Sequence, residues 1–152
     1  MIVMVMPGLD TSALEKENFF FLDTNRIAAT SKSLKDYADK VVSMVWGCHM
    51  AKQDVILHAS GAVARTLTSL HLDVVLVFCA MNAKAEYIES LRKSIPDHLF
   101  DVMHRKIEAP NKWVDIVNSY ASSRDAKYKV CISRKLVLPT KAELQAVMDG
   151  GR

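Results

Sequence analysis

Four short, unbroken apolar runs recur along the chain and are the strongest signal in its sequence. They cover Ile2–Met6, Phe19–Leu22, Val55–Leu57 and Val74–Phe78. Continuous apolar strands are typical of a parallel sheet that is covered by helices on both faces. A fifth run, Tyr128–Ile132, alternates apolar and polar residues and predicts a strand that is half exposed. We therefore expect a mostly parallel sheet of five strands.

Between these runs the apolar residues are spaced as in helices. Leu34, Val41 and Val45 share one helical face, and Ser33 just before them is the expected N-cap. Further helices are expected where apolar residues recur at this spacing, in Val63–Leu70, in Ile88–Leu91 after a cap at Asn82, in Leu99–Ile107, in Trp113–Tyr120 and after a capping box at Thr140–Glu143. Alternating strands and helices predict an α/β fold, a three-layer sandwich formed by a single domain over residues 1–152.

Composition agrees with one folded domain. Half of the 152 residues are hydrophobic and 24% are charged, which is enough apolar material for a core. No apolar run approaches the roughly 18 residues of a membrane helix, and the first residues lack the features of a signal peptide. Cys48, Cys79 and Cys131 are widely spaced, so we expect reduced core residues and a cytoplasmic protein.

Several common chemistries find no support in the residue spacing. The five histidines and three cysteines form no C-x-x-C or H-x-x-x-H pair, so no metal site is expected. The chain also lacks the G-x-S-x-G motif of esterases and the G-x-G-x-x-G motif of dinucleotide-binding domains.

The segment after the first strand is the most informative candidate site. In parallel α/β folds, ligands bind beyond the carboxyl ends of the strands, and the loop after strand one often holds a phosphate. Here that loop contains Gly8, Asp10, Thr11 and Ser12 within Pro7–Lys16. A Pro-Gly turn followed by an ordinary Asp-Thr-Ser helix cap would explain these residues without any ligand.

Pro7–Lys16 resembles the phosphate-binding loop of small P-loop kinases, including the nucleotide-kinase-like proteins of bacteriophages. The resemblance continues in the same order through Phe20–Thr24, Val55–Ser60 and Val75–Arg92, which look like the second to fourth strands of these kinases and the helix into their lid. Asn111–Tyr120 falls where the helix after the lid lies. The resemblance implies a P-loop kinase-like fold with strand one at the centre of the sheet.

The departures from this family fall on the residues that perform its chemistry. An active loop needs glycines, a lysine for the β- and γ-phosphates and a Ser or Thr for magnesium. Gly8 and Ser12 match, but Asp10 stands in place of a glycine and Thr11 in place of the lysine. Each unit of charge lost is worth on the order of 4 kcal/mol beside a phosphate, before screening. We therefore expect a degenerate phosphate loop, no phosphotransfer and no bound cofactor.

The resemblance also implies an acceptor side for the site. Asp23 and Arg26 follow strand two, where such kinases contact the acceptor, and His58, Ser60 and Arg65 follow strand three. A surface ion pair would explain Asp23 and Arg26 equally well, and a histidine inside an apolar run is commonly a core residue.

The expected lid consists of four cations on either side of Pro96, namely Arg92, Lys93, Arg105 and Lys106. In such kinases a cationic lid clamps the phosphates, although a solvated helix face has the same composition. The alternative to a degenerate protein is an active nucleoside or nucleotide kinase that uses Mg-ATP and recruits Arg65, Arg92 or Arg105 in place of the loop lysine.

Charge along the chain is uneven, although the net charge is only +3. Residues 124–141 contain one acidic residue, Asp125, and six basic ones, Arg124, Lys127, Lys129, Arg134, Lys135 and Lys141. Such a stretch can contact nucleic-acid phosphates, or its lysines can protect an edge strand from pairing with other chains.

These observations predict a catalytically degenerate P-loop kinase-like protein. A kinase scaffold without its phosphate loop is most readily reused for binding, so we expect a phage-encoded accessory or virion-associated protein. Its partner would be another protein or a second copy, without a membrane. Trp46, Trp113 and Tyr128 are the candidate exposed aromatics, although Trp113 is more simply explained as part of a core stripe with Val117 and Tyr120. A nucleic-acid-binding accessory protein is the remaining alternative.

Overall fold

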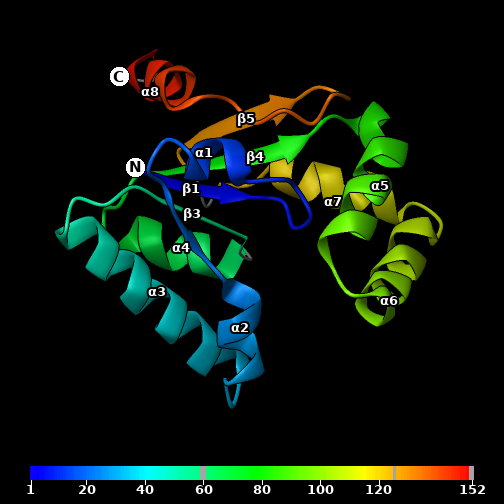
Figure 1. Cartoon of the computed structure of the whole chain (residues 1–152), viewed down its shortest axis with the longest axis horizontal. Helices are drawn as coiled ribbons and strands as arrows, with labels where there is room; N and C mark the ends of the chain where they lie inside the picture. The colour runs from blue at the N-terminus through cyan, green and yellow to red at the C-terminus, as the bar shows by residue number, and fades with distance from the viewer. Residues whose placement is uncertain (59–60, 125, 151–152) are drawn as a thin grey trace.

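A computed structural model describes residues 1–58, 61–124 and 126–150, with residues 61–62 described by their backbone alone. Its centre is one sheet of five parallel strands in the order β2-β3-β1-β4-β5 (Figure 1). The strands are β1 (Ile2–Val5), β2 (Phe20–Leu22), β3 (Val55–His58), β4 (Val74–Cys79) and β5 (Tyr128–Ile132). The predicted parallel α/β sheet is confirmed, with the first strand at its centre.

The continuous apolar runs are explained by burial on both faces of the sheet. Val3 in β1 is paired with Ile56 in β3 and with Val75 in β4, and all three side chains enter the core on one face. The alternate residues, such as Met4 and Leu57, enter a second core on the opposite face. Because both faces are covered, the inner strands have no solvent side on which polar residues would be needed.

Helices cover both faces and complete three layers (Figure 1). One face is covered by α3 (Leu34–Met50) and α4 (Gly61–Ser69), preceded by the short α2 (Thr24–Ala29). The core of the other face receives side chains from α1 (Ser12–Glu15), α5 (Lys84–Ser94), α6 (Asp97–Glu108), α7 (Lys112–Ala121) and α8 (Lys141–Gly150).

Two predicted helix starts are confirmed and one is wrong. The Ser33 hydroxyl accepts a hydrogen bond from the Asp36 N–H, as an N-cap does. Thr140 and Glu143 form the reciprocal capping box. Asn82 is not a cap, because it lies in the middle of a 3₁₀ turn, η1 (Met81–Ala83), that precedes α5.

Several side chains lie elsewhere than their spacing predicted. Leu70 and Leu99 are 42% and 44% exposed; Leu70 lies just beyond the last residue of α4, and Leu99 lies in the first turn of α6. Tyr128 is buried rather than exposed, Trp46 is exposed as predicted, and Trp113 is buried together with Val117, as the core-stripe interpretation of that helix predicted. The free thiols also differ: Cys79 is in the core, Cys48 is half-buried and Cys131 is exposed, so the prediction of three core cysteines is wrong.

No helix in the described ranges has both the length and the apolar character needed to cross a membrane.

Candidate functional site

The candidate site lies where two neighbouring strands send their chains to opposite faces of the sheet. After β1 the chain turns to α1 on one face, and after β3 it enters α4 on the other. In open parallel sheets such a divergence opens a crevice at the carboxyl ends of the strands, and ligands bind there. The loop from Met6 to Thr11 crosses this crevice.

The first half of this loop is packed against α5. The Gly8 carbonyl accepts hydrogen bonds from the hydroxyls of Ser90 (2.5 Å) and Ser94 (3.2 Å), and the Tyr87 hydroxyl donates to the Pro7 carbonyl at 2.6 Å. Gly8 has a φ of +93°, and a Cβ added there would lie 2.7 Å from Cδ1 of Leu91. Helix α5 therefore holds the loop backbone at close range.

The next residue, Leu9, packs into the core and is bonded to β3 through its backbone. Its side chain is only 2% exposed, and its carbonyl accepts a hydrogen bond from Nε2 of His58 at 3.2 Å. Burial lowers the pKa of His58, although the bond to Leu9 and nearby Asp23 oppose this effect. The Thr24 hydroxyl donates to the His58 carbonyl, so the segments that follow β1, β2 and β3 are joined through one neutral histidine. This is the position of a structural histidine.

The three residues that follow, Asp10, Thr11 and Ser12, make contacts within the loop and with α1. Asp10 accepts a hydrogen bond from the Ser12 N–H at 2.9 Å, and this bond is the main reason that the pKa of Asp10 is lowered. Thr11 is buried, and its hydroxyl donates to Glu15 at 2.8 Å. A carboxylate thus occupies the helix start at which a phosphate would otherwise be favoured.

Asp23 and Arg26, which were predicted on the acceptor side, line a cavity of about 730 Å³. Asp23 is the N-cap of α2 and accepts a hydrogen bond from the Arg26 N–H at 3.2 Å. The cavity lies between β2, α2 and α3, and its other lining residues include Phe20, Phe21, Leu22, Ile27, Thr30, Lys40 and Met44. An aromatic and aliphatic wall with charges at its edge is typical of a small-ligand pocket.

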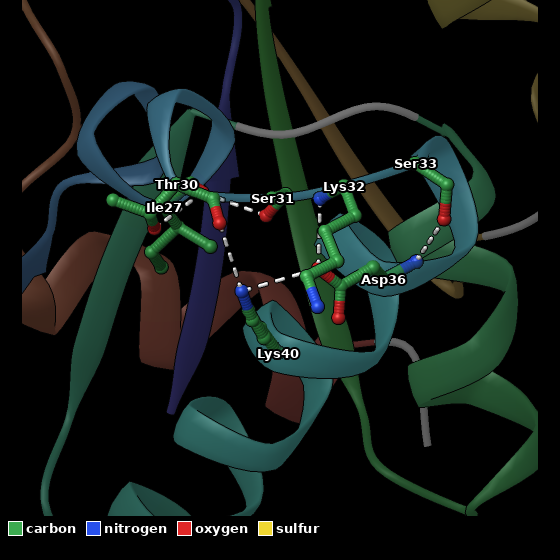
Figure 2. Close-up of polar contacts among 7 residues, drawn as sticks. All are labelled: Ile27, Thr30, Ser31, Lys32, Ser33, Asp36 and Lys40. Carbon is green, nitrogen blue, oxygen red and sulfur yellow. Dashed lines mark hydrogen bonds and ion pairs between the residues drawn. The ribbon is translucent and has the colours of Figure 1, made fainter.

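The wall between α2 and α3 is held by a polar cluster (Figure 2). Nζ of Lys40 donates to the Thr30 carbonyl at 3.2 Å and pairs with Asp36 at 3.1 Å. Asp36 also accepts a hydrogen bond from the Lys32 N–H at 2.9 Å, which lowers the pKa of its carboxyl together with the contact to Lys40. These bonds fix the connection that shapes the cavity.

Two predicted acceptor-side residues remain, Ser60 and Arg65. Ser60 is outside the described residues. Arg65 is in the second turn of α4, on the face of the sheet opposite to α5.

The four predicted lid cations do not converge. Helices α5 and α6 form an antiparallel hairpin, because Arg92 lies over the Phe100 ring at 4.4 Å while Lys84 pairs with Glu108 at 3.5 Å. Arg92 and Lys93 are therefore at one end of the hairpin. Arg105 and Lys106, in the last turn of α6, are near the other end.

A second cavity, of about 1030 Å³, lies over the loop beyond the carboxyl ends of β1, β4 and β5. Its charged lining residues are three acids, Asp10, Glu86 and Glu89, and three bases, Lys93, Arg134 and Lys135. Nη2 of Arg134 pairs with Glu86 at 2.8 Å, which lowers the pKa of Glu86 together with a backbone hydrogen bond. This balanced lining differs from the cationic surroundings that a triphosphate requires.

Most basic side chains of residues 124–141 contact other groups of the same chain. Nζ of Lys129 donates to the carbonyls of Ala121 and Ser123, at 2.8 and 2.9 Å, where α7 ends. Lys127 lies over the Tyr128 ring at 5.2 Å. Because β5 is an edge strand, these lysines also lie where they would discourage pairing with another chain.

Among the described residues, no three His, Cys, Asp or Glu side chains are grouped as a metal site would require. The residues that hold the loop, Tyr87, Ser90 and Ser94, were not predicted from the sequence. Their signal was present, because Ser90 and Ser94 are four apart and share one face of α5. No protein-family model matches this chain, and a comparison with curated proteins found no match.

Proposed function

We propose that this chain is a catalytically degenerate P-loop kinase-like protein that acts by binding and transfers no phosphate from ATP. Two features support the kinase-like origin: the resemblance of Pro7–Lys16 to a phosphate loop, and the central place of β1 in a parallel sheet. The resemblance to bacteriophage proteins extends the proposal to a phage-encoded accessory or virion-associated role.

The closed loop after β1 carries the proposal. A phosphate loop binds by wrapping free backbone N–H groups around the phosphates. Here the Gly8 carbonyl is held by Ser90 and Ser94, and the Leu9 side chain is buried in the core. The ionised Asp10 carboxylate, at the lip of the loop, would repel a triphosphate.

The cavity beside β2 supports a binding role on the acceptor side of the fold. It has an apolar wall, and Asp23 and Arg26 line it, joined by the N-cap hydrogen bond from the Arg26 backbone N–H to Asp23, although the loop that would deliver phosphate is closed. A protein with this combination would hold a ligand without modifying it.

A thermal-shift titration with Mg-ATP tests the proposal. A ligand present at 100 times its Kd would stabilise the fold by about 2.7 kcal/mol, and we expect no shift at millimolar Mg-ATP. A magnesium-dependent shift of the unaltered protein would contradict the proposal and favour the active-kinase alternative. That alternative finds little support in Arg65, Arg92 and Arg105, because they lie at separate places.

The double variant Asp10→Gly, Thr11→Lys tests whether ATP is excluded by the charge of the loop or by the packing that closes it. It restores the glycine and lysine of an active loop but leaves the contacts of Gly8 and Leu9 in place. We expect this variant to bind Mg-ATP no better than the unaltered chain. Binding by the variant would mean that charge, rather than closure, excludes ATP.

A further inference from the structure

The cavity beside β2 has an aromatic and aliphatic wall on the side of the strand. Phe20, Phe21 and Leu22 of β2 all line it. Because successive residues of a strand point to opposite faces of the sheet, a cavity that reaches all three lies along the open edge of β2. Met44 of α3 adds a thioether to the lining, and such a group packs favourably against aromatic rings. This wall is suited to an aromatic ring of a ligand.

Two of the charged side chains that line the cavity are already bound within the molecule. Nζ of Lys40 pairs with Asp36 and donates to the Thr30 carbonyl (Figure 2). The Asp23 carboxylate caps α2 by accepting a hydrogen bond from the Arg26 backbone N–H. Lys40 and Asp23 therefore shape the cavity, and their charges are largely satisfied by the protein itself.

Three other polar groups of the lining are not engaged in this way. The Arg26 guanidinium, the Asp39 carboxylate and the Ser43 hydroxyl have no hydrogen-bond or ion-pair partner among the residues that the structure describes. Asp39 and Ser43 are four apart on α3, so they lie on adjacent turns of one helix face. Arg26 belongs to α2. The cavity thus presents one cation from α2 and one anion, with a hydroxyl beside it, from α3.

We propose that this cavity binds a small zwitterion with an aromatic side chain, of the chemical class of the aromatic amino acids. The ring lies against Phe20 and Met44. The ligand carboxylate pairs with Arg26, and the ligand ammonium pairs with Asp39, each through charge-assisted hydrogen bonds. This inference rests on the proposed function, because it names the ligand of the binding role proposed for the cavity.

The pair of opposite charges favours a zwitterion over a ligand with a single charge. A carboxylic acid would satisfy Arg26 and an amine would satisfy Asp39, but only a ligand with both charges satisfies both residues. The lining has two acids and two bases, with Asp23 and Lys40 as the second pair, so a ligand without net charge preserves this balance. The volume of about 730 Å³ is within the range of roughly 300 to 1,000 Å³ that is typical of small-molecule sites.

Calorimetric titrations with L-phenylalanine and two analogues test the proposal. Phenethylamine lacks the carboxylate of L-phenylalanine, and hydrocinnamate lacks its ammonium group. We expect L-phenylalanine to bind with a Kd below about 1 mM, and each analogue to bind at least about tenfold more weakly, because one charge-assisted hydrogen bond is lost.

Two variants of the protein assign each charge of the ligand to its partner. Arg26→Gln should weaken binding of L-phenylalanine by about tenfold without weakening that of phenethylamine, which has no carboxylate to lose. Asp39→Asn should weaken L-phenylalanine by a similar factor without weakening hydrocinnamate. Arg105→Gln and Asp115→Asn, exposed changes on α6 and α7, are the matched controls and should bind all three compounds as the unaltered chain does.

Phe20→Ser provides a second, independent measurement. Phe20 is 49% exposed, so this variant should fold, as circular dichroism would verify, while it weakens all three compounds. An absence of saturable L-phenylalanine binding would overturn the inference. So would analogues that bind as tightly as L-phenylalanine, or variants at Arg26 and Asp39 that behave like the controls. None of these results alters the Mg-ATP titration, which tests the proposed function separately at the loop after β1.

Discussion

The conformation of the loop after β1 depends on Gly8. Its φ of +93° belongs to a region that other residues enter at a cost, and Leu91 of α5 occupies the space that a side chain would need. Gly47 is the opposite case, because it has ordinary helical surroundings and open space. The loop conformation therefore requires a glycine at position 8, whereas the helix does not require one at position 47.

The variant Gly8→Ala should destabilise the protein by about 3 kcal/mol, because the added carbon meets Leu91 in a strained backbone conformation. Urea unfolding, followed by circular dichroism at dilute protein concentration, measures the change. Gly47→Ala is the matched control and should stabilise the single chain by up to about 1 kcal/mol. If both variants changed the free energy of unfolding equally, the loop would be able to move away from Leu91 of α5 with little loss of stability.

His58 should make stability depend on pH in the mildly acidic range. Burial lowers its pKa below the ordinary value of 6.5, so the unfolded chain binds a proton before the folded chain does. The stability that His58 contributes is therefore present above pH 6.5 and is lost as the pH falls toward the lower pKa of the folded state.

Unfolding free energies measured between pH 7.5 and about 5 test this expectation. We expect the unaltered protein to lose stability across this range and His58→Gln to lose less. His98→Gln, which changes an exposed histidine of α6, should retain the full pH dependence. A variant at His58 with an unchanged slope would show that other groups cause the titration.

At the scale of elements, ion pairs hold the start of α8 close to the amino-terminal ends of β1 and β3. The carboxylate of Asp54, just before β3, contacts Nζ of Lys141 at 2.6 Å and the Met1 ammonium at 2.8 Å. The Lys141 N–H also donates to Glu17 at 2.9 Å. Thus residues far apart in the sequence fix the last helix against the first strand.

Asp54→Asn should destabilise the fold by about 1 to 2 kcal/mol, because it removes the charge from two hydrogen bonds. We also expect faster hydrogen exchange in α8, measured by mass spectrometry. Asp115→Asn, an exposed change on α7, should leave both quantities unchanged. Unaltered protection of α8 in Asp54→Asn would mean that Leu144 and its apolar neighbours hold the helix alone.

The same carboxylate contributes to acid sensitivity. Burial by itself would raise the pKa of Asp54, but the hydrogen bonds from Lys141 and the Met1 ammonium outweigh it, and the pKa lies below the ordinary 3.8. The stabilisation is therefore present above pH 3.8 and is lost as the pH falls through the lower pKa of the folded protein. This range is separate from that of His58.

At the scale of the whole molecule, the two edges of the sheet differ in what lies beside them. At the β5 edge, Lys129 is bound to the end of α7, and Lys127 covers Tyr128. The β2 edge has the exposed Phe20 and the cavity shared with α2 and α3. The cavity and the exposed aromatic residue thus lie at the β2 edge, rather than at the basic residues 124–141 that the sequence pointed to.

Much of the fold was determined by the sequence alone. The apolar runs identified all five strands, and their unbroken character indicated a covered parallel sheet, because burial on both faces removes any reason for alternation. Ser33 and Thr140 marked helix starts correctly, since capping depends on residues within one turn.

Only the tertiary structure decided what lies around those residues. Leu9 is buried in the core, and Ser90 and Ser94 hold Gly8, because α5 packs on a loop that precedes it by about eighty residues. The same long-range packing buries Trp113 against Tyr87 and leaves Trp46 in solvent. Local spacing determines which face of an element is apolar, whereas the partner that covers that face depends on how the chain returns to it in space.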